Sequence, residues 1–90
     1  MLIKGLRTRA ARSILRSRIE EGVLPKPGTL YVPRDERFRL PTIILLGYSV
    51  ELYRRTKDDW IIHPILLSGS DIVEPTWWSL ANSYDMIDTL

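Results

Sequence analysis

The sequence contains no cysteine among its 90 residues. This absence excludes disulfide bonds, thiolate nucleophiles and cysteine-based zinc sites. Small secreted domains usually depend on disulfide bonds for their stability. We therefore expect a cytoplasmic protein or a component of a larger assembly; for a viral protein this means the host cytoplasm or the virion.

Long apolar runs are also missing. The longest run, residues 42–46, has the length of a strand, whereas a membrane-spanning helix needs about 20 apolar residues. We therefore expect no membrane span. The hydrophobic fraction of 44% and the charged fraction of 27% are typical of a folded globular protein. The length of the chain predicts a single domain over residues 1–90.

The residue sets that catalysis usually requires are absent from the sequence. His63 is the only histidine, and it lies in an apolar run directly before Pro64. This context favours a partly buried strand residue over a general base. Neither a glycine-rich phosphate loop nor a nucleophile elbow occurs. The sequence therefore predicts no enzyme activity, no bound cofactor and no metal site.

Hydrophobic periodicity predicts an α+β fold. We expect a basic helix within residues 1–22, a proline-containing connector over 23–28, a β-rich core over 29–67 and a C-terminal helix over 74–89. The core is predicted as a small antiparallel sheet of three or four strands, with both helices on one of its faces. Residues 42–46 are apolar throughout, which predicts a strand covered on both faces. Gly47 directly after them indicates a bulge or a turn.

Charge is unevenly distributed along the chain. Residues 1–50 hold ten Lys/Arg and four Asp/Glu, whereas residues 51–90 hold three and seven. Six basic residues precede Glu20, the first acidic residue: Lys4, Arg7, Arg9, Arg12, Arg16 and Arg18. On a helical wheel Arg9, Arg12, Arg16 and Glu20 share one face, while Arg7 and Arg18 interrupt the apolar arc. This pattern predicts a contact surface for an acidic partner, unless the acidic second half of the chain neutralises it.

The periodicity of the predicted C-terminal helix places two adjacent tryptophans in different environments. Trp77 lies on the apolar face and is predicted to join the core. Trp78 shares the polar face with Asn82 and Asp85. An exposed Trp on such a face is a suitable anchor for a partner. The alternative is that Trp78 packs on a strand or loop of its own domain.

These observations favour a non-enzymatic accessory protein, of the kind found in phages and mobile elements. It is predicted to dock on a larger protein or nucleoprotein assembly through Arg9, Arg12, Arg16 and Trp78. Nucleic-acid binding by the six basic residues is the first alternative, because arginine matches phosphate geometry. The second is a structural subunit of a virion or other assembly, in which Pro25 and Pro27 belong to an arm that reaches a neighbour. Homo-oligomerisation is a further alternative.

Overall fold

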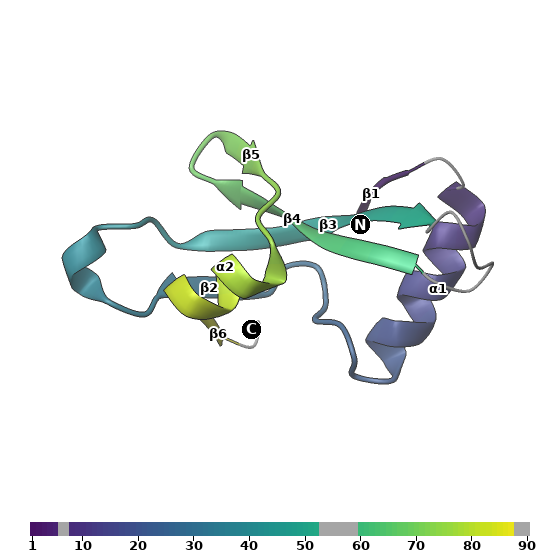
Figure 1. Cartoon of the computed structure of the whole chain (residues 1–90), viewed down its shortest axis with the longest axis horizontal. Helices are drawn as coiled ribbons and strands as arrows, with labels where there is room; N and C mark the ends of the chain where they lie inside the picture. The colour runs from purple at the N-terminus through teal and green to yellow at the C-terminus, as the bar shows by residue number, and fades with distance from the viewer. Residues whose placement is uncertain (6–7, 53–59, 88–90) are drawn as a thin grey trace.

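The computed structural model describes residues 1–5, 8–52 and 60–87 of the chain (Figure 1). A long hairpin of two strands runs along the molecule, with α1 near one end and the 3₁₀ helix η1 at the other (Figure 1). In chain order the elements are β1 (Leu2–Lys4), α1 (Thr8–Glu20), β2 (Leu30–Pro33), η1 (Glu36–Phe38), β3 (Ile43–Leu52), β4 (Trp60–Ser68), β5 (Asp71–Val73), α2 (Trp77–Ser83) and β6 (Tyr84–Ile87).

The strands form one six-stranded sheet with the order β5-β4-β3-β2-β6, and β1 pairs with β3 outside this path. The β1–β3 pairing is parallel, whereas the other pairings are antiparallel. Two strands share one side of β3: β2 pairs with residues 43–44 and β1 pairs with residues 47–49. The shift in register between Leu45 and Gly47 confirms the predicted bulge.

The predicted sheet of three or four strands is therefore wrong, and one of the additional strands comes from the N-terminus. Residues 2–4 were expected to open the first helix, but they form β1, and α1 begins only at Thr8. Ile3 packs against the core from this strand. A segment of three residues is too short to show a period. The pairing partner in β3, which the local sequence does not reveal, decides their conformation.

A second additional strand, β5, lies just beyond the predicted β-rich core, and a third comes from the predicted C-terminal helix over 74–89. The helix α2 covers only Trp77–Ser83, and the chain continues as β6, which pairs with β2 over four residues. Thr76 caps α2, because its hydroxyl accepts a hydrogen bond from the Ser79 amide at 3.1 Å. The spacing of Tyr84 and Ile87 fits a helix, but hydrogen bonding to the outer side of β2 determines a strand.

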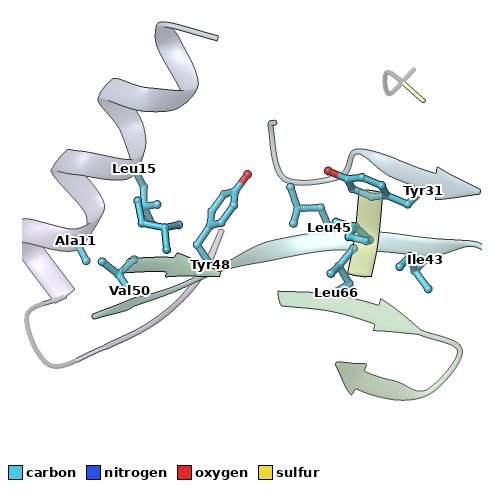
Figure 2. Packing of buried hydrophobic residues seen from close by; sticks show 10 residues of the cluster. Ala11, Leu15, Tyr31, Ile43, Leu45, Tyr48, Val50 and Leu66 are labelled. Atoms are coloured by element: carbon cyan, nitrogen blue, oxygen red, sulfur yellow. The ribbon is translucent and has the colours of Figure 1, made fainter. Parts of the chain in front are cut away.

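Both helices pack on the same face of the sheet, as expected. Figure 2 shows Ala11 and Leu15 of α1 directed toward Val50 and Tyr48 of β3. Leu80 of α2 belongs to the same buried cluster. The remaining buried members, from β2, β3 and β4, are Tyr31, Ile43, Leu45, Ile62 and Leu66. Because strand side chains alternate between faces, this core accounts for only one side of the sheet.

Stability is expected to fall as the pH rises above about 10, the usual pKa of tyrosine. Burial raises the pKa of the Tyr48 hydroxyl far above that value, and the nearby Tyr31 raises it further. The unfolded chain then releases a proton that the folded chain keeps, so the free energy of unfolding decreases with pH. Urea unfolding of the native chain and Tyr48→Phe across this range measures the effect. The prediction fails if the two proteins show the same slope above this pH.

Candidate contact surfaces

The arginine face of α1, defined as Arg9, Arg12 and Arg16, is exposed as the helical wheel predicts. Ala11 and Leu15 on the opposite side of the helix are buried. Because side chains three or four positions apart lie on one side of a helix, burying these two residues directs the arginines outward. The exposure of the arginine face therefore follows directly from the packing of α1 on β3.

The six basic residues that sequence reasoning grouped for nucleic-acid binding do not form one surface. Lys4 lies on β1 rather than on the helix, and Arg18 is half-buried. Arg7 lies outside the described residues. Arg12 and Arg16 line a shallow hollow of about 310 Å³ together with Met1 and Ile3. Two guanidinium groups at one hollow provide a suitable place for a carboxylate or phosphate of a partner.

The ion pairs of the described residues do not include the arginine face. They join Lys4 to Glu74 at 3.2 Å and Arg34 to Asp85 at 3.2 Å. A third pair joins neighbours in sequence, Arg37 and Asp35, at 2.8 Å. Within this part of the chain, the acidic second half thus pairs with Lys4 and Arg34, and no carboxylate lies within ion-pair distance of the arginine face, although Glu20 follows Arg16 by about one turn on the same side of α1.

The two adjacent tryptophans lie in different environments. Trp77 is half-buried, and its indole nitrogen donates a hydrogen bond to the Ile62 carbonyl at 2.7 Å. The centroid of a Trp77 ring is 6.1 Å from that of the Tyr48 ring. Trp78 is 76% exposed, so the alternative in which it packs on its own domain does not hold. A large aromatic side chain with so much surface in water is suited to burial against a partner.

The structure does not bring the arginine face and Trp78 together. The helix α1 lies near one end of the long axis, whereas α2, which carries Trp78, lies nearer its middle (Figure 1). The sequence assigned these residues to one partner-binding set because helical periodicity reports only which side of each helix faces outward. They are two separate contact surfaces on one molecule.

His63 lies on β4, half-buried and directly opposite Ser49 of β3. No hydrogen bond joins these two side chains in the structure. Within the described ranges, no group of three or more His, Asp or Glu side chains is placed to hold a metal ion. The geometry thus presents no assembled nucleophile and base at His63.

The proline-containing connector is attached to the body of the protein. The Tyr48 hydroxyl donates a hydrogen bond to the Pro25 carbonyl. The Gly28 amide donates to the Leu45 carbonyl at 2.7 Å, and the Leu45 amide donates to the Thr29 carbonyl at 2.9 Å. These bonds hold the connector against β3. For Pro25 and Pro27 to form an arm that reaches a neighbour, the connector would first have to detach from β3.

Sequence reasoning missed a surface on the sheet face that points away from the helices. Successive cross-strand partners there are all aliphatic: Ile87 pairs with Leu30, Leu30 with Ile44, Ile44 with Leu67 and Leu67 with Ile72. These five residues, here called the aliphatic row, cross the sheet from β6 to β5. The sequence carried a signal for this face, since residues 42–46 show no alternation between apolar and polar side chains.

Within the described part of the chain, no helix is both long and apolar enough to cross a membrane. Comparison with models of protein families, with curated proteins and with solved structures found no match to this chain.

Proposed function

We propose that this chain is a non-catalytic accessory protein that docks on a larger, acidic macromolecular partner through the arginine face of α1. The observation that carries the proposal is the exposure of three arginines on a helix whose opposite side is buried, with no described acidic side chain in ion-pair contact. Such a surface attracts a negatively charged partner and orients it during the encounter.

The spacing of the arginine face supports binding to an extended acidic surface. Steps of three and four residues place successive arginines about one helical turn apart, or about 5.4 Å along the axis. Each guanidinium can make two parallel hydrogen bonds to one carboxylate or phosphate. Trp78 offers a second contact, which supplies apolar area instead of charge. A partner that touches both surfaces has to extend from the end of the molecule to α2, which favours a large assembly over a small ligand.

Nucleic acid remains an alternative partner for the same arginines. Neutralising phosphates on duplex DNA gives an affinity that falls with salt, with a slope of about −0.9 per phosphate in a log–log plot. A protein partner is the leading proposal because an exposed Trp on a separate helix adds a contact of the type that is common at protein interfaces.

The proposal predicts that Arg9→Gln, Arg12→Gln and Arg16→Gln together weaken binding of the captured partner at least about tenfold. The native chain is immobilised, exposed to extract from its source cells with and without nuclease, and the retained proteins are identified by mass spectrometry. Binding of the purified partner is then measured by titration with each variant. The matched control changes three exposed basic residues outside α1 by the same charge: Lys26→Gln, Arg37→Gln and Arg39→Gln.

The expected result is a protein that is retained after nuclease treatment, binds the control variant like the native chain and loses affinity for the α1 variant. Trp78→Ala in the same titration tests the second contact. Complete loss of retained protein on nuclease treatment would favour the nucleic-acid alternative, which the salt slope then checks. Equal affinity of the two triple variants would contradict the assignment of the arginine face.

A further inference from the structure

The aliphatic row is an apolar surface that stays partly exposed in the described structure, although Ile65, two positions from Leu67 on the same face of β4, is buried. Its three most accessible members are Ile72 at 63%, Ile87 at 44% and Ile44 at 38% exposure, and Leu30 and Leu67 are half-buried between them. Neighbouring strands are about 4.8 Å apart, so a row across five strands is about 19 Å long. A continuous apolar strip of this length differs from the scattered apolar residues that are normal on a protein surface.

The surface area of the chain is large enough to provide an interface. The whole chain exposes 6811 Å², whereas a monomeric protein of its 10.5 kDa mass exposes about 5400 Å². The excess is about 1400 Å². A standard interface buries about 800 Å² on each partner. One interface of standard size would remove a little more than half of this excess.

Lys4 and Asp85, two charged residues on the same sheet face as the aliphatic row, are each in an ion pair. Lys4 lies on the same sheet face, since it pairs with Ser49, and its ammonium contacts the Glu74 carboxylate at 3.2 Å. At the β6 end, Asp85 contacts Arg34 at 3.2 Å. Each pair is neutral, so two identical faces can approach without net repulsion from these groups. Two copies of the arginine face, in contrast, would repel each other.

We propose that two copies of this chain pack face to face through the aliphatic row and form a two-fold symmetric dimer. An all-aliphatic row needs no complementary charge on its partner, so it is complementary to a second copy of itself. The two sheets then form a sandwich with a spacing of about 10 Å, the usual packing of sheets. The interpretation of residues 42–46 as a strand covered on both faces then applies to the dimer: the helices cover one face and the second copy covers the other.

The dimer leaves the arginine face available. The helices pack on the opposite side of the sheet, so dimerisation through the aliphatic row presents two arginine faces outward. A partner with repeated acidic sites would then bind both faces of one dimer more tightly than a single face. Dimerisation itself does not depend on the proposed function, and each can be tested without the other.

The first test is the mass of the purified chain in solution, measured by sedimentation equilibrium. The native chain is expected at twice the 10.5 kDa mass of one copy. Ile44→Lys places a charge in the centre of the row on both copies, so the dimer dissociation constant is expected to rise at least about 100-fold. Val23→Lys is the matched control, because Val23 is an exposed aliphatic residue between α1 and β2 and lies outside the row. Circular dichroism checks that each variant is folded.

The second test uses the absence of cysteine from the chain. Ile44→Cys introduces a single thiol in the middle of the row, and a short bis-maleimide should join two copies across the interface. Val23→Cys should give little joined product under the same conditions. If Ile44→Lys does not fold, Ile72→Lys on the short edge strand β5 replaces it. A native chain of single-copy mass, a dimer that persists in the folded lysine variant, or equal cross-linking of the two thiol variants would overturn the proposal.

Discussion

Replacing Tyr48 with alanine is expected to lower the free energy of unfolding by about 3–5 kcal/mol. Tyr48 is among the largest side chains of the core and is fully buried. It lies between Leu15 of α1 and Leu45 of β3 (Figure 2), and Trp77 of α2 lies close to its ring. Removing the ring leaves a cavity where both helices meet the sheet. Because small domains have a stability of only about 5–15 kcal/mol, this one substitution removes a large part of it.

Tyr48→Phe separates the contribution of the hydroxyl from that of the ring. The Tyr48 hydroxyl donates a hydrogen bond to the Pro25 carbonyl, and its loss is expected to cost about 1–2 kcal/mol. Urea denaturation followed by circular dichroism measures both variants against the native chain. A cost for Tyr48→Ala no greater than that for Tyr48→Phe would show that the ring does not organise the core as described.

Gly47→Ala is expected to destabilise the protein by about 2–4 kcal/mol and to detach β1 from the sheet. A side chain at position 47 would overlap the backbone of Leu2, the residue that pairs with Gly47. Backbone atoms of a paired strand cannot rotate away as a flexible side chain can. The strand β1 must therefore move, and Ile3 then loses its packing against the core. Urea denaturation measures the stability, and hydrogen exchange measures the protection of the β1 amides that face β3.

Two other glycines provide controls for the backbone effect of alanine. Gly22 and Gly69 have φ angles of 78° and 62°, and no atom lies within 4 Å of the position a Cβ would take. Alanine at either position costs about 1–2 kcal/mol through the left-handed conformation, but should leave the β1 amides protected. If Gly47→Ala also left these amides protected, the close approach of Leu2 would not be the reason why position 47 requires glycine.

The periodicity of α1 shows how much of the candidate site was predictable. Ala11 and Leu15 are buried and Arg9, Arg12 and Arg16 are exposed, as the wheel predicts, because helix geometry relates positions only three or four residues apart. The same local argument separated Trp77 from Trp78. A prediction of which side of a single helix is buried needs only the residues of that helix, so the local sequence contained the necessary information.

The errors in the fold occur where a short segment meets a distant strand. The local pattern of residues 2–4 and 84–87 fits a helix, yet they form β1 and β6. Their partners are in β3 and β2, far away in the sequence. A short segment contributes little conformational preference of its own, so hydrogen bonding to an available strand decides its structure.

The sequence by itself determined the side of α1 that faces water, the strand over residues 42–46, and a bulge or turn at Gly47. These are local properties, set by side-chain periodicity and by the absence of a Cβ. Only the tertiary structure decided that the arginine face and Trp78 are separate surfaces. It also aligned five aliphatic residues from five strands into one row. Strand register places these residues beside one another, and register depends on pairing between distant segments, which no local pattern specifies.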